Sequence, residues 1–251
     1  MADKNQYIAV FDSGVGGISV LRELMKLMPE ENYLYYGDSV NAPYGTRTTQ
    51  EVCRLTLAAA DMLFSRNVKA LVVACNTATA AAIGELRQIY PDKIIIGIEP
   101  ALKVAADHFP GGRVGVMATQ VTLREEKFAT LSQQFPQMQV SLIPAPGLVE
   151  LIEKGSTQAK LEAFLKPILK DYVNRLDAVV LGCTHYPFAA DAIRRILGED
   201  VALLDGGKGT AWQTRRRLEE AGLLGEGPGS LQMENSTMDP TFLQRAMELL
   251  A

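Results

Sequence analysis

Four short polar segments carry the residue types that could do chemistry in this 251-residue chain, and each follows an apolar run directly or nearly so. They are the segments Asp12–Gly14, Pro43–Gly45, Cys75–Thr77 and Cys183–His185. If the apolar runs are parallel strands, ligands bind outside their carboxyl ends, where these segments must lie. Carboxylate, thiol, imidazole and amide groups in one crevice would offer acids, bases and hydrogen-bond donors. The sequence therefore predicts a catalytic or binding site at these strand ends.

Two of the three cysteines are candidate acid/base groups. Cys75 and Cys183 each end an apolar run and precede polar residues that can begin a helix. Backbone N–H groups at a helix start favour the thiolate, so such a thiol can be poised near working pH. Cys53 lies beside Val52 and Leu55 in a predicted helix, which is the pattern of a structural cysteine.

Other interpretations of the same residues remain open. Asp12 could be only a helix cap, and His185 a structural hydrogen-bonding residue. Asn76 and Thr77 could be plain N-caps, a role that is compatible with ligand contact. His108 ends a helix before a proline and is assigned no function.

Two cofactor motifs are incomplete. Gly14-x-Gly16-Gly17 with Asp38 about 20 residues on is similar to a dinucleotide fingerprint, but its third glycine position is Ser19. A zinc site of Cys183, His185 and Cys75 would need a fourth ligand or a water, and no Cys-x-x-Cys pair supports it. The sequence therefore predicts neither a cofactor nor a metal.

Apolar strand-like runs alternate with helical patterns along the chain, which predicts parallel sheets with helices on both faces. The expected strands are 8–11, 32–36, 69–74, 94–98, 113–117, 139–143, 178–181 and 201–204. Thr48 with Glu51, and Thr122 with Glu125, are capping boxes that predict helix starts. The first of these helices should run to about Arg66.

The pattern restarts near Gly111, and each half contains an apolar strand that delivers a cysteine at its carboxyl end. This predicts an α/β fold of two similar doubly wound domains with mainly parallel sheets. The domains are expected at 1–97 plus 208–251 and at 98–207. Residues 222–239 should be loop or edge strand, and a last helix over 240–250 should pack on the first domain.

Composition excludes several classes of function. The net charge is −4 and the pI about 5.4, and Arg215–Arg217 is the only basic triplet, so no nucleic-acid surface is expected. The chain contains no run of about 18 apolar residues, so no membrane-spanning helix is expected. The polar start of the chain predicts no signal peptide. Three distant cysteines suggest reduced thiols and a cytoplasmic location.

Longer motifs surround the four polar segments. They are FDSGVGG (11–17), YGDSVNAPYG (36–45), ACNTA (74–78) and GCTHYP (182–187), with IEPA (98–101) and LVELIEKG (148–155) as looser matches. Together they resemble the glutamate racemases of the aspartate/glutamate racemase superfamily. The cysteine motifs alone would also suit aspartate or hydantoin racemases, whereas FDSGVGG with PYG is specific to the glutamate enzymes.

The resemblance implies cofactor-independent interconversion of L- and D-glutamate by two thiols, Cys75 and Cys183. It implies that Asp12 assists Cys75, and that His185 and Glu153 assist Cys183. The implied substrate-binding residues are Asp12, Ser13, Tyr44, Gly45, Asn76, Thr77, Thr119, Thr184 and His185. It also implies an active site in the cleft between the two domains and a homodimer with glutamate as its small-molecule partner. The implied role is a supply of D-glutamate for peptidoglycan synthesis.

Some positions depart from the family pattern. LREEKF follows Thr122, Ala145 stands where many members have a cysteine, and GGKGTAWQT follows Asp205. These differences bear on regulation and on the dimer surface more than on the chemistry. The alternatives are a racemase of a related amino acid such as aspartate, a non-catalytic amino-acid-binding relative, and a nucleotide-dependent oxidoreductase that depends on the incomplete glycine motif.

Overall fold

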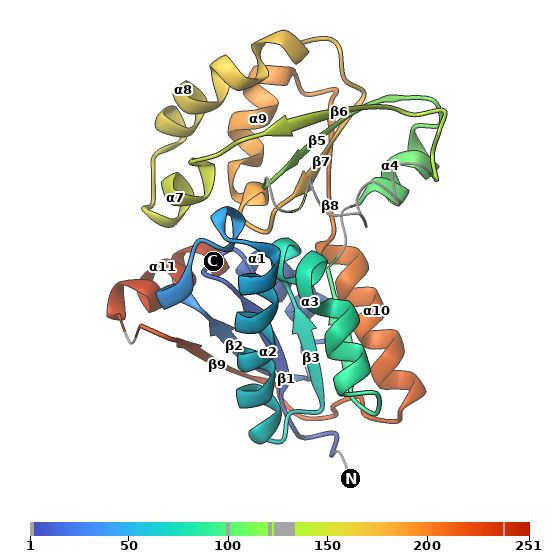
Figure 1. Cartoon of the computed structure of the whole chain (residues 1–251), viewed down its shortest axis with the longest axis vertical. Helices are drawn as coiled ribbons and strands as arrows, with labels where there is room; N and C mark the ends of the chain where they lie inside the picture. Colours follow the sequence, from blue (N-terminus) through green and yellow to red (C-terminus); the bar gives the residue numbers. More distant parts are fainter. Residues whose placement is uncertain (1–2, 99–100, 120–121, 123–133, 238) are drawn as a thin grey trace. The chain divides into compact units, whose positions relative to one another are not determined.

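A computed structural model describes residues 3–98, 101–119, 122, 134–237 and 239–251 of the chain. It contains two compact units, which are Met1–Glu99 with Gly207–Ala251 (unit 1) and Pro100–Gly206 (unit 2). Each unit alternates strands with helices, as the sequence pattern predicts (Figure 1). Within the described residues, every helix is too short or too polar to cross a bilayer.

Unit 1 holds five strands and five α-helices among its described residues. The strands are β1 (Ile8–Asp12), β2 (Asn32–Gly37), β3 (Ala70–Val73), β4 (Ile94–Gly97) and β9 (Ser230–Asn235). The helices are α1 (Ile18–Leu27), α2 (Thr49–Ser65), α3 (Asn76–Ile89), α10 (Gly207–Glu220) and α11 (Pro240–Leu250). Short 3-10 helices occupy Ser39–Asn41 and Tyr44–Thr46.

Unit 2 is built in the same way. Its described strands are β5 (Arg113–Ala118), β6 (Gln139–Pro144), β7 (Ala178–Gly182) and β8 (Ala202–Asp205). Its described α-helices are α4 (Leu102–His108), α7 (Leu148–Glu153), α8 (Gln158–Leu169) and α9 (Ala190–Leu197). Short 3-10 helices occupy Lys170–Tyr172 and Tyr186–Ala189.

The sheet of unit 1 is entirely parallel, with strand order β4-β3-β1-β2-β9. The central strand, β1, is an apolar run that ends in Asp12, and all of its residues are buried. Parallel sheets are covered on both faces, which is why their strands are continuous apolar runs. β9 pairs with β2 along its whole length, so the segment expected to be loop or edge strand contains an edge strand.

Two groups of helices cover this sheet. α2 packs on α3, and both share an apolar cluster with Phe11 and Leu34 of the strands. α1 packs on α10 and α11. Tyr33 and Tyr35 alternate with Leu34 along β2, and their hydroxyls reach α1 and the loop before it. α1 therefore covers the face opposite α2 and α3.

The capping box predicted for α2 is confirmed. The Thr48 hydroxyl accepts the Glu51 N–H at 3.2 Å, and the Glu51 carboxylate accepts the Thr48 N–H at 3.1 Å. The helix ends at Ser65, one residue before the predicted end. The second predicted box depends on Glu125, which lies outside the described residues.

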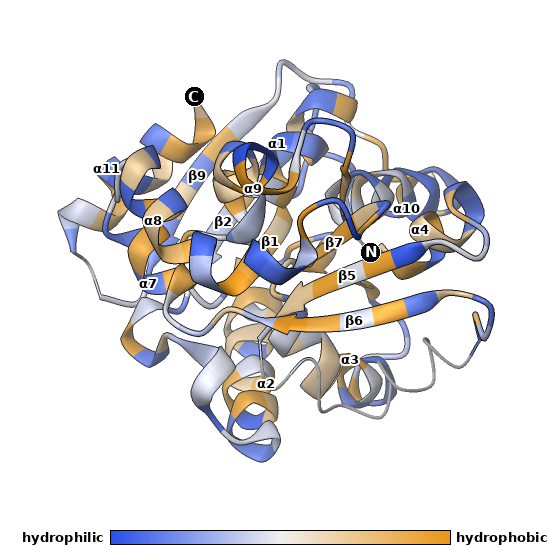
Figure 2. Ribbon diagram, turned by 90° about the horizontal axis from the view of Figure 1, so that it is seen from above, coloured by the Kyte–Doolittle hydropathy of each residue, from blue (hydrophilic) through white to orange (hydrophobic). Residues whose placement is uncertain are grey.

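The sheet of unit 2 is also entirely parallel, with strand order β6-β5-β7-β8. Val179 and Val180, consecutive in β7, belong to two different apolar clusters, one shared with α7, α8 and α9 and the other with α4. Figure 2 shows β5 as hydrophobic along most of its length, whereas paler segments interrupt the edge strand β6. The interior strands of this unit are thus covered on both faces.

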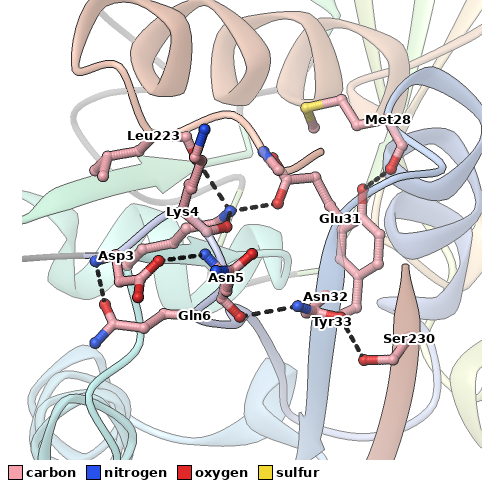
Figure 3. Close-up of polar contacts among 12 residues, drawn as sticks. Asp3, Lys4, Asn5, Gln6, Met28, Glu31, Asn32, Tyr33, Leu223 and Ser230 are labelled. Atoms are coloured by element: carbon pink, nitrogen blue, oxygen red, sulfur yellow. Dashed lines mark hydrogen bonds and ion pairs between the residues drawn. The ribbon is translucent and has the colours of Figure 1, made fainter. Parts of the chain in front are cut away.

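A buried ion pair ties four segments of unit 1 together at the amino-terminal edge of its sheet (Figure 3). Lys69, just before β3, pairs with Glu31, just before β2, and their side chains are 0% and 2% exposed. The Lys69 ammonium also donates to the carbonyl oxygens of Lys4 and Leu223, and the Glu31 carboxylate accepts the Gly225 N–H. One pair of charges therefore holds both strand starts, the N-terminal segment and the chain after α10.

Candidate active site

Cys75 follows β3 and is the N-cap of α3, with 5% of its surface exposed. Its sulfur accepts the Ala78 N–H at 3.4 Å, and its S–H group donates to the Ser13 hydroxyl oxygen at 3.7 Å. The free N–H groups of a helix start stabilise negative charge on a capping atom. The structure therefore places this thiol where the sequence predicted it, at backbone donors that favour the thiolate.

Asp12 is the last residue of β1 and is fully buried. Its Oδ1 atom accepts the Gly14 N–H at 2.9 Å. The N-cap of α1 is Gly17, so Asp12 does not cap that helix. A Cβ atom at Gly17 would lie 2.6 Å from the Cβ of Asp12 and 3.1 Å from that of Ala74, so only glycine fits there. The chain after Asp12 therefore packs closely against the carboxyl ends of β1 and β3.

Tyr44 and Gly45 lie together in a 3-10 helix after β2. The Tyr44 hydroxyl is buried and donates to the Asp38 carboxylate at 2.7 Å. Burial and this hydrogen bond raise the pKa of Tyr44 far above its ordinary value, so the side chain stays a neutral phenol. Asp38, considered in the sequence only as a ribose ligand, instead accepts Tyr44 and the Asn41 amide. The two residues are six positions apart, a spacing that does not by itself indicate a contact outside regular structure, so sequence reasoning missed this pair.

Asn76 and Thr77 begin α3 and are 5% and 3% exposed. Both polar atoms of the Asn76 amide are buried without a hydrogen-bond partner in the part of the chain that the structure describes. Buried polar groups in native proteins are nearly always satisfied, so such an orphan group calls for an explanation. An amide can donate to a carboxylate and accept from an ammonium group. The Asn76 side chain is thus suited to a zwitterionic ligand.

The second thiol lies in unit 2. Cys183 directly follows β7 and is 7% exposed. Its sulfur is 3.8 Å from Nδ1 of His185, and Nε2 of His185 is 3.0 Å from Oε1 of Glu153, at the end of α7. The sequence pattern suggested a helix start at Cys183, but a short 3-10 helix with Pro187 comes first, and α9 begins only at Ala190. The described partner of this thiol is an imidazole.

Opposing effects act on the charge of His185, which is 3% exposed. Burial by itself lowers the pKa of its imidazole. Hydrogen bonds with Cys183 and Glu153 and the negative charges of both outweigh burial, and they raise the pKa of His185 well above its ordinary value. The imidazole is therefore held as a cation that can donate to the sulfur and to the carboxylate.

Replacing Glu153 by glutamine should lower the pKa of His185, because the substitution removes a negative charge 3.0 Å away. The chain has two histidines, so NMR titration of their ring protons is simple to interpret. Because the folded pKa of His185 lies above 6.5, its stabilising effect is complete below pH 6.5 and is lost as pH rises through the folded pKa. The free energy of unfolding should decline over that window more steeply in the wild type than in Glu153→Gln.

Glu162→Gln is the matched control for this titration. It breaks a pair with Arg195 in the same unit, at 2.9 Å, whose side chains are 32% and 63% exposed. Both the His185 titration and the pH dependence of unfolding should match the wild type. If the His185 pKa stayed the same in Glu153→Gln, the carboxylate would not be its electrostatic partner.

The remaining expected site residues are divided between the units. Thr184 lies between Cys183 and His185 and is buried. Thr119 follows β5, and its hydroxyl contacts the hydroxyl of Thr122 at 3.1 Å and accepts the Thr122 N–H at 3.3 Å. Unit 1 therefore contains Asp12, Ser13, Tyr44, Gly45, Cys75, Asn76 and Thr77, and unit 2 contains Thr119, Glu153, Cys183, Thr184 and His185.

Cys53 differs from the other two thiols. It lies in α2, half-buried, and donates to the Glu85 carboxylate at 3.1 Å. Burial and the bond to Glu85 raise the pKa of Cys53 to about 11, so this thiol stays protonated at neutral pH. Over the residues that are described, no three His, Cys, Asp or Glu side chains are grouped to hold a metal ion.

Comparisons with known proteins agree with the motifs. The sequence model described as Asp/Glu/Hydantoin racemase matches residues 17–214. A glutamate racemase of Clostridium botulinum is 46% identical over 255 residues, covering 100% of this chain and 99% of that protein. The structure of a glutamate racemase isoform from Bacillus anthracis has a TM-score of 0.88 at 30% identity, covering 98% of this chain and 94% of that one. A Francisella tularensis glutamate racemase solved with D-glutamate scores 0.85 at 29% identity with the same coverage.

The sequence match and the structural match both extend over nearly the whole chain, including both units and both thiol motifs. An identity of this size over full length shows common membership as well as a common fold. The chain belongs to the Asp/Glu/Hydantoin racemase family and is an isomerase of its glutamate racemase group.

Proposed function

We propose that this chain interconverts L- and D-glutamate without a cofactor, by removing the α-proton with one thiol and returning a proton from another. The thiols are Cys75 and Cys183. The observation that supports this most directly is that each unit holds a buried thiol just after an interior parallel strand, beside side chains that can exchange protons. The similarity to glutamate racemases supports the choice of substrate.

Two acid/base groups are needed because racemisation moves a proton from one face of the α-carbon to the other. One group cannot easily serve both faces, so one acts as the base while the other, on the opposite face, acts as the acid. The roles exchange when the reaction runs backwards. The α-proton is very weakly acidic, so fixed hydrogen-bond donors must stabilise the charge that develops on the substrate.

The neighbours of each thiol fit its role. The backbone N–H that contacts Cys75 stabilises its thiolate, and Asp12 and Ser13 are proposed to assist its proton exchange. Nδ1 of His185 lies 3.8 Å from the Cys183 sulfur, where the imidazole can exchange a proton with it, and Glu153 holds that imidazole in place. The two thiols are thus supported by different devices, one by a helix start and one by an ion pair.

Substrate recognition is proposed for the remaining polar groups. The Asn76 amide, which has no hydrogen-bond partner among the described residues, would bind the carboxylate or ammonium group of the amino acid. The Tyr44 side chain stays a neutral phenol and so adds no charge of its own beside the Asp38 carboxylate. Further contacts are assigned by family resemblance to Ser13, Gly45, Thr77, Thr119, Thr184, Asp12 and His185.

The setting of the reaction is proposed from the same resemblance. Members of the family commonly form homodimers, and D-glutamate is a building block of bacterial peptidoglycan. We therefore propose that the chain acts in the cytoplasm as a homodimer and supplies D-glutamate for cell-wall synthesis.

The test is to follow optical rotation after adding the protein, treated exhaustively with EDTA, to L-glutamate, D-glutamate or L-aspartate. Both glutamate enantiomers should converge on the racemate with no addition, and aspartate should react far more slowly. A clear preference for aspartate would overturn the substrate assignment. Activity that vanished with EDTA and returned with zinc would overturn the two-thiol proposal.

A further inference from the structure

We propose that Tyr35 is a positioning residue for the Cys75 half of the reaction, an inference that rests on the proposed function. Tyr35 is fully buried and lies on β2, the strand next to the central strand β1. Its hydroxyl contacts the loop that carries Asp12, Ser13 and Gly14.

The Tyr35 hydroxyl donates to the Gly14 carbonyl oxygen at 2.7 Å. Gly37, two residues along β2 and so on the same face, leaves the space that this carbonyl needs. A Cβ atom at Gly37 would lie 2.8 Å from the Gly14 oxygen. The hydroxyl and the missing side chain together determine where the Gly14 peptide lies.

The other side of Gly14 faces the proposed catalytic carboxylate. The Gly14 N–H donates to Oδ1 of Asp12 at 2.9 Å. The backbone of Asp12 is held by β2 as well, because its carbonyl oxygen accepts the Asp38 N–H at 2.9 Å. Asp12 is buried, so its orientation depends on contacts with the protein, the Gly14 N–H among them, rather than on water. A chain of contacts therefore runs from the Tyr35 hydroxyl through Gly14 to the Asp12 carboxylate.

Removing the Tyr35 hydroxyl would release the Gly14 carbonyl and loosen the loop that orients Asp12 and Ser13. The effect should fall on Cys75, which Ser13 contacts, and not on Cys183, whose described partners all lie in unit 2. Racemisation passes through both thiols, so its rate cannot distinguish them. A reaction that needs one base can.

The experiment uses 3-chloroglutamate with either D or L configuration at the α-carbon. A thiolate takes the α-proton, the Cα–Cβ double bond forms and chloride leaves; water then hydrolyses the enamine to 2-oxoglutarate and ammonium. By family resemblance, Cys75 faces the D enantiomer and Cys183 the L enantiomer. In Tyr35→Phe we expect elimination from the D enantiomer to fall about tenfold, and from the L enantiomer by less than about twofold, as for one lost positioning hydrogen bond.

Tyr33→Phe is the matched control. Tyr33 lies on the same strand, is equally buried, and its hydroxyl donates to the carbonyl oxygens of Leu24 and Met28 at the far end of α1. The Tyr33→Phe substitution should lower the stability of the protein without changing the elimination rate for either enantiomer. Equal loss for both enantiomers, or no loss, in Tyr35→Phe would overturn the inference. If the wild type also failed to act on either enantiomer, the proposed function itself would be wrong.

Discussion

Replacing Cys75 or Cys183 by alanine should abolish racemisation of glutamate, because no proton donor would remain opposite the surviving base. Serine in either position leaves a hydroxyl, a much weaker acid than a thiol. The turnover of either serine variant should therefore fall by about 10²- to 10⁴-fold, the usual contribution of a general acid or base. The measurement is the initial rate of change of optical rotation in both directions, with circular dichroism to show that the fold is intact.

Elimination from 3-chloroglutamate then separates the two thiols. Cys75→Ser should still act on the L enantiomer and Cys183→Ser on the D enantiomer, because each keeps one base. Cys53→Ala should behave as the wild type, since that thiol contacts Glu85 on α3 and stays protonated. Equal retention of both enantiomers in either serine variant would rule out the two-base mechanism.

Replacing Lys69 by methionine should lower the free energy of unfolding by about 3–5 kcal/mol, the usual cost of leaving a buried charge without its partner. The Glu31 side chain is 2% exposed and would keep its negative charge. Among the described contacts, the Gly225 N–H would remain as its hydrogen-bond donor. The carbonyl oxygens of Lys4 and Leu223 would lose the ammonium as well. Urea-induced unfolding, followed by circular dichroism, measures the difference.

Two companions make the result specific. Lys69→Met combined with Glu31→Gln removes both charges and keeps an acceptor for Gly225, so it should recover a large part of the loss. Arg66→Met breaks an exposed pair with Glu234 in the same unit and should cost less than about 1 kcal/mol, because solvent screens the pair. A similar cost for Lys69→Met and Arg66→Met would show that burial of the Lys69 pair contributes little.

The strands and the two thiols were predictable because their signals are local. Apolar runs such as Ile8–Phe11 must be buried on both sides in a parallel sheet, and a polar segment after each run must lie at the sheet edge. The start of α2 was predictable for the same reason, since Thr48 and Glu51 are three residues apart. Family resemblance supplied roles that spacing alone left open, those of Glu153 and Thr119 among them.

Contacts between distant segments could not be predicted from the sequence. Lys69 was expected simply as the first residue of a buried strand, and its partners Glu31 and Leu223 are far away along the chain. The hydroxyl of Tyr35 reaches Gly14 only because β1 and β2 pair in one register. Helices α7 and α9 were not assigned bounds, because neither begins with a side-chain cap: Gly147 precedes one and Ala189 the other.

Unit 1 is discontinuous, and this determines the order in which the molecule can fold during synthesis. Unit 2 is one uninterrupted stretch that ends at Gly206, so it can fold once that residue has left the ribosome. Unit 1 must wait for β9 and α11, because β9 covers the open edge of β2. Until then β2 exposes unpaired backbone groups that can pair with another chain. The sheet that positions Cys75 is therefore completed last during synthesis, once the C-terminal segment of unit 1 has been made.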